Sequence, residues 1–278
     1  MKVAFQGEPG AYSEQAVFDY YGEVETLPCE SFDVMFDSVA SGKSDLALAP
    51  IENSLAGSIH QNYDLLLQHD LHIVGEYLLR VHHCLITMPG VKKEDIKKAI
   101  SHPQALGQCA GYLRSHGIKA EQVYDTAGSV KMLKESGARE TAAIASRRAA
   151  EIYEMQILEE GIEDNAENYT RFLAVGREAV VPAALSESRG EGEAKTSIVF
   201  TLKNMPGALF KALSVFALRD IDLTKIESRP LQGKPWEYLF YIDFIGSTQD
   251  EVSKRALDHL GEYAMTLRVL GSYPRFRG

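Results

Sequence analysis

Three polar stretches of the chain hold residues that could together bind a small anion and act on it. Thr170-Arg171-Phe172 places a hydroxyl, a fixed cation and an aromatic ring at consecutive positions. Upstream, Asn53-Ser54 follows Pro50, and Ser101-His102 precedes Pro103. A hydroxyl can donate a hydrogen bond to a departing group, and an arginine can hold a carboxylate through two parallel hydrogen bonds. The three stretches therefore predict one polar pocket for a small anion.

The elements expected around these stretches favour such a pocket. Asn53-Ser54 follows a strand expected at 46–50, which ends at the proline. Ser101-His102 lies between a second strand, at 99–100, and a helix that begins at the next proline. In open α/β sheets ligands bind beyond the carboxyl ends of strands, and the first turn of a helix offers free N–H groups to an anion.

A simpler interpretation stays open for each of these residues. Asparagine and serine are common helix caps, so Asn53-Ser54 and Ser101 could serve only in that role. Arg171 could equally form an ion pair within the protein. His102 could be an ordinary surface histidine whose hydrogen bonds are already satisfied. Gln104 and Gln108 are four residues apart and share a helix face.

Alternating apolar strands and helices indicate an α/β architecture for the first part of the chain. Strands are expected at residues 2–5, 46–50, 79–87, 99–100 and 142–145, and one helix is expected over 103–117. The stretch 179–195 is rich in serine, glutamate, glycine and proline and has little periodicity, which is typical of a linker. Beyond it the order strand–helix–strand–strand–helix–strand is that of a ferredoxin-like unit.

Composition narrows the class of protein and its partners. At 278 residues the chain is long enough for about two domains. A formal net charge of −10 argues against a nucleic-acid partner, which would need a basic face. The three cysteines show no CxxC pairing, so we expect neither a disulfide framework nor a zinc site. Because no signal peptide or membrane-spanning run is evident, we expect no membrane partner and a cytoplasmic location.

Six segments, in this order along the chain, resemble a known family. Four resemble the active-site motifs of prephenate dehydratases: Gly10-Ala11-Tyr12-Ser13-Glu14, Pro50-Ile51-Glu52-Asn53-Ser54, Ser101-His102-Pro103-Gln104-Ala105-Leu106 and Thr170-Arg171-Phe172. Two more resemble the phenylalanine-binding motifs of the family's regulatory ACT domain: Asn204-Met205-Pro206-Gly207-Ala208-Leu209 and Glu227-Ser228-Arg229-Pro230. The resemblance covers nearly the whole chain.

The resemblance implies a catalytic domain over 1–178, a linker over 179–195 and an ACT domain over 196–278. The catalytic domain would have two α/β lobes similar to those of type II periplasmic binding proteins. Lobe one would comprise 1–76 plus 168–178, and lobe two 77–167. Because the chain starts at the first strand, without the helical chorismate mutase extension of some family members, we expect a monofunctional enzyme.

The resemblance also assigns roles to individual residues. The expected catalytic residues are Thr170, Asn53, Ser101, His102 and Gln108. The expected substrate-binding residues are Ser13, Ser54, Gln104, Arg171 and Phe172. The residues expected to bind phenylalanine as an effector are Asn204, Met205, Gly207, Ala208, Leu209, Glu227, Ser228, Arg229 and Pro230.

The implied activity is that of a carbon–oxygen lyase in phenylalanine biosynthesis. Prephenate would lose carbon dioxide and water to give phenylpyruvate, with no cofactor or metal, under feedback control by L-phenylalanine. The family further implies a homo-oligomer built through the ACT domains, a dimer or a homotetramer. Two alternatives stay open: an arogenate dehydratase, which performs the same elimination on the transaminated substrate, and a non-catalytic phenylalanine-sensing binding protein.

Overall fold

The computed structural model describes residues 1–180, 193–231 and 237–276. Most of the linker expected over 179–195 therefore lies outside the described residues. The chain divides into two compact units, one of residues 1–65 and 77–172 and the other of residues 66–76 and 173–278. None of the helices in the described ranges has the length and apolar character that a bilayer crossing requires.

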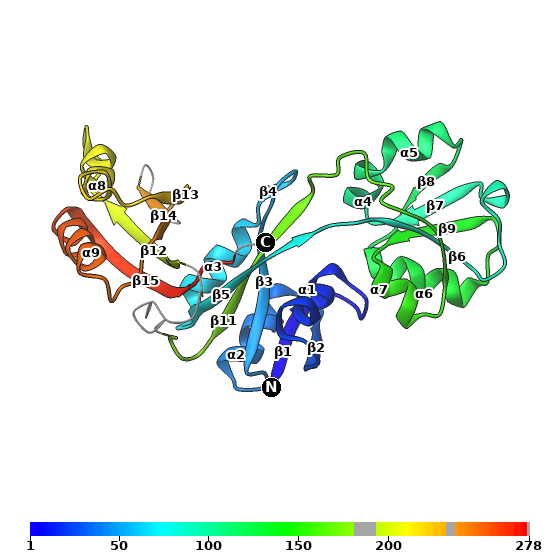
Figure 1. The fold of residues 1–278 in the computed structure, drawn as a ribbon, viewed down its shortest axis with the longest axis horizontal. Helices are drawn as coiled ribbons and strands as arrows, with labels where there is room; N and C mark the ends of the chain where they lie inside the picture. The colour runs from blue at the N-terminus through cyan, green and yellow to red at the C-terminus, as the bar shows by residue number, and fades with distance from the viewer. Residues whose placement is uncertain (181–192, 232–236, 277–278) are drawn as a thin grey trace. The chain divides into compact units, whose positions relative to one another are not determined.

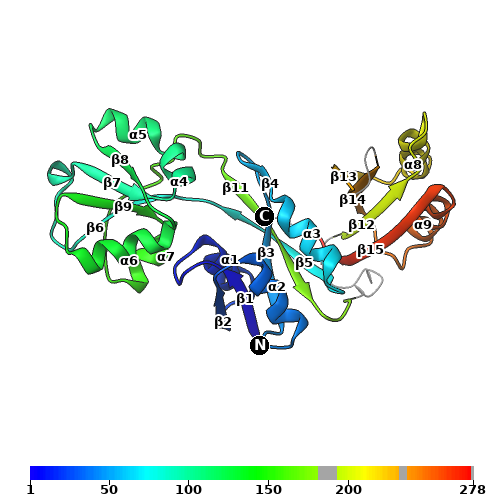
Figure 2. The ribbon, with the colours of Figure 1, turned by 180° about the vertical axis from the view of Figure 1, so that it is seen from behind.

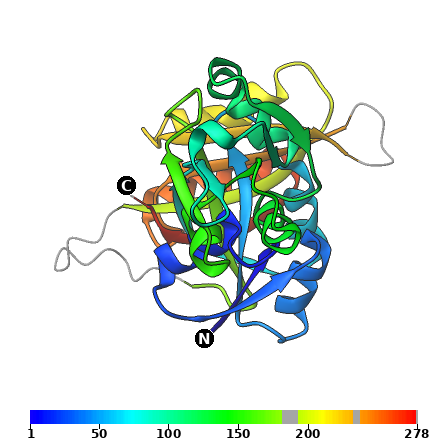
Figure 3. The same ribbon diagram turned by 90° about the vertical axis from the view of Figure 1, so that its right-hand side faces the viewer.

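The first sheet has the strand order β2-β1-β3-β11-β5, with the short β4 paired to β3. Its strands are β1 (Lys2–Gln6), β2 (Glu25–Cys29), β3 (Leu46–Asn53), β4 (Gly57–Ser58), β5 (His72–Arg80) and β11 (Tyr169–Gly176). Helices α1 (Tyr12–Tyr21), α2 (Phe32–Ala40) and α3 (His60–Gln68) connect them. The chain begins in β1, the dark blue strand in Figure 3, which runs parallel to β2 and β3. Because helices cover these parallel strands, β1 is apolar at successive positions, with Val3, Ala4 and Phe5 all buried.

The strand expected to stop at Pro50 continues to Asn53. A proline removes a hydrogen-bond donor but has a φ angle compatible with extended backbone. The Pro50 carbonyl accepts a hydrogen bond of 2.6 Å from Asn62 Nδ2. Asn53 is consequently the last residue of β3 and does not lie beyond the strand.

The second sheet has the strand order β10-β6-β9-β7-β8. Its strands are β6 (Cys84–Thr87), β7 (Lys98–Ser101), β8 (Lys119–Gln122), β9 (Thr141–Ala145) and β10 (Gln156–Glu160). A short 3₁₀ turn, η1 (Lys93–Asp95), precedes β7. Helices α4 (Pro103–Gln108) and α5 (Ala110–Ser115) lie on one side of this sheet, and α6 (Thr126–Ser136) and α7 (Arg147–Ile152) lie on the other (Figure 2).

Two expected elements of this region are each divided in the structure. The single strand expected over 79–87 is β5 followed by β6, which belong to different sheets, with residues 81–83 between them. The single helix expected over 103–117 is α4 followed by α5, with Cys109 at φ −113° between them. The Asp164 carboxylate accepts hydrogen bonds from the backbone N–H groups of Gly111 and Tyr112, at 2.8 and 3.1 Å, and so caps α5 as a separate helix.

The third sheet belongs to the ferredoxin-like unit and has the order β13-β14-β12-β15 (Figure 1). The chain order is β12 (Ala194–Leu202), α8 (Ala208–Ala217), β13 (Leu223–Pro230), β14 (Tyr238–Ile245), α9 (Glu251–Tyr263) and β15 (Ala264–Pro274). Ile198 and Phe200 of β12 pack in one apolar core with Phe216 of α8 and Leu260 of α9. This arrangement confirms the expected fold class, a mixed α/β protein with a βαββαβ unit at its C-terminal end.

Candidate functional site

A pocket of about 180 Å³ in the first unit is lined mainly by neutral hydrogen-bonding side chains. These polar side chains are those of Tyr12, Ser13, Asn53, His83, His102, Gln104, Gln108, Thr126, Asn168 and Thr170. Among the described residues that line it, there is no aspartate, glutamate, lysine or arginine. The pocket therefore offers dipoles and hydrogen bonds to a ligand without placing a fixed charge against it.

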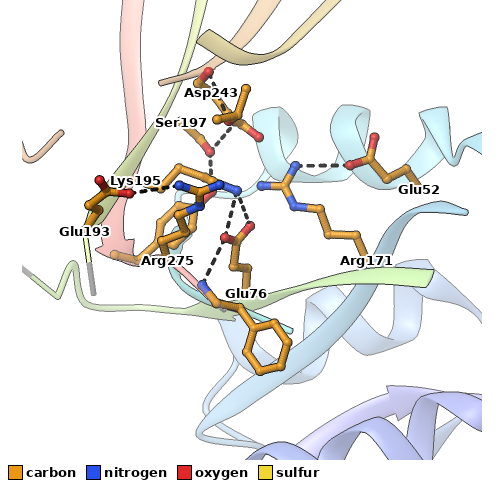
Figure 4. Close-up of polar contacts among 11 residues, drawn as sticks. Glu52, Glu76, Arg171, Glu193, Lys195, Ser197, Asp243 and Arg275 are labelled. Atoms are coloured by element: carbon orange, nitrogen blue, oxygen red, sulfur yellow. Dashed lines mark hydrogen bonds and ion pairs between the residues drawn. The ribbon is translucent and has the colours of Figure 1, made fainter. Parts of the chain in front are cut away.

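β11 presents alternate residues to this pocket. Thr170 and Phe172 line it, and Arg171, between them, does not. Successive side chains of a strand point to opposite faces, so all three could not have faced one pocket. The Arg171 side chain is largely buried, and its guanidinium forms an ion pair of 3.2 Å with Glu52 (Figure 4). Of the two roles considered for Arg171, the structure shows the ion pair within the protein.

Asn53 is held in one orientation by the backbone. Its Oδ1 accepts hydrogen bonds from the N–H groups of Leu55 and Ala56, at 3.0 and 2.9 Å. Because backbone N–H groups can only donate, the Nδ2 group must face the other way, where it lies 3.0 Å from Thr170 Oγ1. An amide nitrogen only donates, so Thr170 accepts this bond and keeps its own hydrogen for another partner.

Asn168 lies between Asn53 and Gln108 and is hydrogen-bonded to both, so the orientation of the Asn53 amide also determines that of the Gln108 amide. Asn53 Nδ2 donates to Asn168 Oδ1 at 2.8 Å, and Asn168 Nδ2 donates to Gln108 Oε1 at 3.1 Å. Gln108 Oε1 also lies 2.7 Å from Nε2 of His83. The Gln108 carbonyl oxygen is therefore occupied by protein donors, and its amide nitrogen is the end left for a ligand.

His102 is positioned as the N-cap of α4. Its Nδ1 accepts a hydrogen bond of 3.2 Å from the backbone N–H of Gln104. A neutral His102 ring then carries its proton on Nε2, which makes this nitrogen a donor. Gln104 and Ser13, both expected to bind substrate, also line the pocket.

Besides Arg171, two more of the expected site residues lie outside the pocket lining. Ser101 is fully buried, and its hydroxyl donates to the Ile144 carbonyl at 2.6 Å, so it joins β7 to β9 instead of facing a ligand. Ser54 Oγ donates to the Glu167 carbonyl at 2.8 Å and accepts from the Tyr169 N–H at 2.9 Å. Both hydroxyls are committed to backbone groups.

The sequence analysis missed four polar residues of the pocket: Tyr12, His83, Thr126 and Asn168. Tyr12 stands next to Ser13 within a segment that was already singled out, and Asn168 lies two residues before Thr170. His83 fell inside the long strand expected over 79–87. Recognising the break between β5 and β6 would have placed this histidine on a connection between sheets, where functional residues concentrate.

The buried thiols do not add a nucleophile. Burial raises the pKa of Cys84 to about 12, and burial also raises the pKa of Cys109. Neither residue lines the pocket. Both cysteines are therefore protonated core residues.

The ferredoxin-like unit contains a second pocket, of about 120 Å³, at the start of α8. Four expected effector-binding residues line it: Asn204, Met205, Ala208 and Leu209. Gly207 is the N-cap of α8 in the left-handed conformation, with φ 76°, which favours glycine. The motif Glu227-Ser228-Arg229-Pro230 lies on β13, paired with β14, and does not line this pocket within the chain.

Comparison with characterised proteins identifies relatives over the full length of the chain. Arogenate dehydratase/prephenate dehydratase 2, chloroplastic, of Arabidopsis thaliana is 50% identical over 283 residues, which cover 99% of this chain and 73% of the relative. Two further relatives from the same plant are also named chloroplastic. These names contradict the cytoplasmic location expected from the sequence, and that expectation is wrong.

Solved structures match the chain equally fully. A protein described as a novel type of quorum quenching acylase, GqqA, has a TM-score of 0.91 and 36% identity, covering 99% of this chain and 98% of that one. Prephenate dehydratase in complex with L-Phe from Arthrobacter aurescens has a TM-score of 0.88 and 32% identity, covering 99% and 90%.

Two family models match the chain at the positions of the two pockets. The ACT domain model matches residues 196–261, which contain the pocket at the start of α8. The prephenate dehydratase model matches residues 3–180, which contain every residue of the larger pocket. The chain belongs to the prephenate dehydratase family, and it carries an ACT domain after the dehydratase domain.

Proposed function

We propose that the protein is a carbon–oxygen lyase that converts prephenate to phenylpyruvate, with arogenate as the alternative substrate. The carboxyl–carbon bond of the ring breaks, its electron pair enters the ring, and the ring hydroxyl departs. Carbon dioxide and water are the other products, once the departing hydroxide has gained a proton. The observation that carries the proposal is the Thr170 hydroxyl, which accepts from Asn53 and faces the pocket with its hydrogen unassigned.

Thr170 is suited to stabilise the departing hydroxyl by a hydrogen bond. An alcohol is a poor acid, so the proton itself is better supplied by water or by His102. Within the described parts of the chain we find no protein acceptor for the Thr170 hydrogen. One oriented hydrogen-bond donor of this kind contributes about 10²–10³ in rate.

The absence of cations from the described lining agrees with the chemistry of decarboxylation. A salt bridge to the ring carboxylate would stabilise the ground state, whereas the carboxylate must lose its charge in the transition state. Neutral donors, such as the Gln108 amide and the His102 ring, can orient a carboxylate while stabilising its charged ground state less than a salt bridge would.

The ACT domain supports regulation by L-phenylalanine. Asn204, Met205, Ala208 and Leu209 all line the pocket in that domain. Backbone N–H groups at the start of α8 can bind the amino-acid carboxylate. The Arthrobacter aurescens relative is described as a complex with L-Phe. We expect phenylalanine to lower turnover.

We also propose that the protein assembles through its ACT domain, as a dimer or a homotetramer. Phe210 and Leu218, both on or next to α8, are each 76% exposed in the single chain, and Ile226 of β13 is 50% exposed. Exposed apolar side chains mark an interface when they form a contiguous patch, and we propose that these three side chains belong to one. A monomer mass by light scattering, with and without phenylalanine, would contradict the assembly.

Acyl-amide hydrolysis is a second candidate because of the close likeness to the quorum quenching acylase. An acylase of the serine type needs a hydroxyl activated by a neighbouring base. Among the described pocket residues, the only hydroxyl hydrogen-bonded to a histidine ring is that of Tyr12, on His83. We therefore rank the dehydratase first, and release of a free amine from an N-acyl substrate tests the alternative.

The deciding experiment measures phenylpyruvate formed from prephenate and phenylalanine formed from arogenate. We expect turnover of at least one substrate by the wild type and a loss of about 10²–10³ in Thr170→Val, with Thr170→Ser retaining more activity. No turnover of either substrate would favour a non-catalytic phenylalanine sensor. Unchanged turnover at saturating phenylalanine, with binding confirmed by calorimetry, would contradict the proposed inhibition.

A further inference from the structure

His83 is a buried polar residue at the wall of the proposed active site. Only 2% of it is exposed. Both nitrogens of its ring are engaged by protein groups, Nε2 with Gln108 Oε1 at 2.7 Å and Nδ1 with the Tyr12 hydroxyl at 2.7 Å. The Tyr12 ring also packs edge-on against the imidazole, with ring centroids 5.5 Å apart. His83 is therefore not placed to exchange a proton directly with a ligand.

The hydrogen-bond network determines which nitrogen of His83 carries the proton. The backbone orients Asn53, Asn53 orients Asn168, and Asn168 orients Gln108 so that Oε1 faces His83. A carbonyl oxygen only accepts, so His83 Nε2 must donate. In a neutral ring Nδ1 is then an acceptor. The Tyr12 hydroxyl lies 2.7 Å from this nitrogen and 2.8 Å from the His82 carbonyl oxygen, so its one hydrogen is shared between two acceptors.

The surroundings of the ring agree with a neutral His83. Burial lowers its pKa, and this effect outweighs the hydrogen bond with Gln108 and the attraction of Glu163, while His82 lowers the pKa further. The Glu163 carboxylate accepts from the His83 backbone N–H at 2.9 Å and also lies 3.0 Å from His82 Nδ1. The titratable group of α1 that faces the His83 ring is the Tyr12 phenol, and burial raises the pKa of this phenol.

We infer that His83 is a positioning residue, which holds the Gln108 side chain so that its amide N–H groups are presented to an oxygen of the substrate. With Oε1 occupied by His83 and Asn168, the amide nitrogen is the free end of Gln108. In the described ranges it has no protein acceptor, and Gln108 lines the pocket. Without His83, Gln108 Oε1 keeps only the hydrogen bond of 3.1 Å from Asn168 and loses the shorter contact of 2.7 Å. The amide would then rotate more readily and present its oxygen to the substrate, where a carboxylate or hydroxyl oxygen would be repelled. The inference rests on the proposed dehydratase activity.

A double-mutant cycle between the two residues tests this role. The variants are His83→Leu, which removes the donor, His83→Gln, whose amide nitrogen can replace Nε2, and Gln108→Leu. We expect His83→Leu to lower kcat/KM by about 10–100-fold in the wild-type background, as expected for a displaced binding group. His83→Gln should recover most of that loss. In the Gln108→Leu background, His83→Leu should lower kcat/KM by less than about twofold, because there is no amide left to position.

The outcomes separate this inference from the proposed function. Inactive wild-type protein contradicts the function itself, whereas an active wild type with equal losses from His83→Leu in both backgrounds contradicts the inference. If the leucine variant fails to fold, His83→Asn, which is polar but too short to reach Gln108, replaces it in the cycle. As a readout independent of activity, ¹⁵N NMR of the imidazole should show a protonated Nε2 and a bare Nδ1. The opposite tautomer would overturn the assignment.

Discussion

The Nδ2 atom of Asn53 donates a hydrogen bond of 3.0 Å to the hydroxyl of Thr170, 117 positions further along the chain. Two backbone N–H groups, of Leu55 and Ala56, prevent the Asn53 amide from turning over. The direction of this bond decides what Thr170 can do, because a hydroxyl that accepts from the protein is free to donate to the substrate. The relationship links the end of β3 to the start of β11.

Asn53→Asp should therefore abolish the function of Thr170 without removing it. An ionised carboxylate cannot donate, so the Thr170 hydrogen would turn toward the introduced carboxylate and away from the substrate. We expect kcat to fall by about 10²–10³, the cost of losing one oriented donor in an active site. Steady-state kinetics on prephenate measures it, with far-UV circular dichroism as the folding control. Activity within a few-fold of wild type would show that the Asn53–Thr170 bond has no such role.

Arg171→Leu should lower stability and leave substrate binding nearly unchanged. The variant removes the guanidinium that lies 3.2 Å from the Glu52 carboxylate, which should cost about 1–3 kcal/mol in the free energy of unfolding. Because Arg171 lies outside the pocket lining, KM should change by less than about threefold. Urea unfolding and substrate titration together check both parts. A large rise in KM with little change in stability would instead identify Arg171 as a carboxylate clamp.

The ion pair between Glu76 and Lys195 should contribute strongly to the stability of the second unit. Lys195 Nζ lies 2.7 Å from Glu76 Oε1 and 2.8 Å from Oε2, and the Glu76 side chain is fully buried (Figure 4). Lys195→Met would take the ammonium group away from a buried carboxylate, so we expect a loss of about 3–5 kcal/mol. The double variant with Glu76→Gln should lose less than the sum of the single changes.

A matched control for this prediction is Lys97→Met, at an exposed pair with Glu140 whose side chains are 70% and 64% exposed. Exposed pairs contribute about 0–1 kcal/mol, so this variant should be nearly neutral. Urea unfolding of both variants at one pH makes the comparison. If the two variants lose the same free energy of unfolding, burial does not explain the contribution of the Glu76–Lys195 pair.

Stability should decrease on acidification partly because of His83. Burial lowers the pKa of folded His83 below its ordinary value of 6.5, so below that pH the unfolded chain binds a proton that the folded protein resists. The free energy of unfolding therefore falls as the pH falls from about 6.5 toward the folded pKa, by at most about 1.4 kcal/mol per pH unit. His83→Gln, which cannot titrate, should show a shallower decrease between about pH 7.5 and 5. Parallel pH profiles for the two proteins would contradict this prediction.

The sequence was sufficient to predict the architecture, but it did not predict where an expected strand and an expected helix are each divided in two. The spacing of apolar residues predicted the α/β region and the βαββαβ unit, because a strand or helix with one buried face has apolar residues at a regular local spacing. The division of the stretch 79–87 into β5 and β6 was missed, since both strands are apolar and only the sheet that each joins separates them. The division at Cys109 was missed because the cap of α5 is Asp164, more than fifty positions away.

By itself the sequence determined the family and the residue types of the site, through short motifs in a recognisable order. Only the tertiary structure decided which of those residues face the pocket. Thr170 and Phe172 line it and Arg171 does not, because neighbouring strand residues point to opposite sides and the sequence does not say which side holds the pocket. The partners that orient Thr170 and Gln108, namely Asn53, Asn168 and His83, come from distant segments, so the direction of each hydrogen bond exists only in the folded chain.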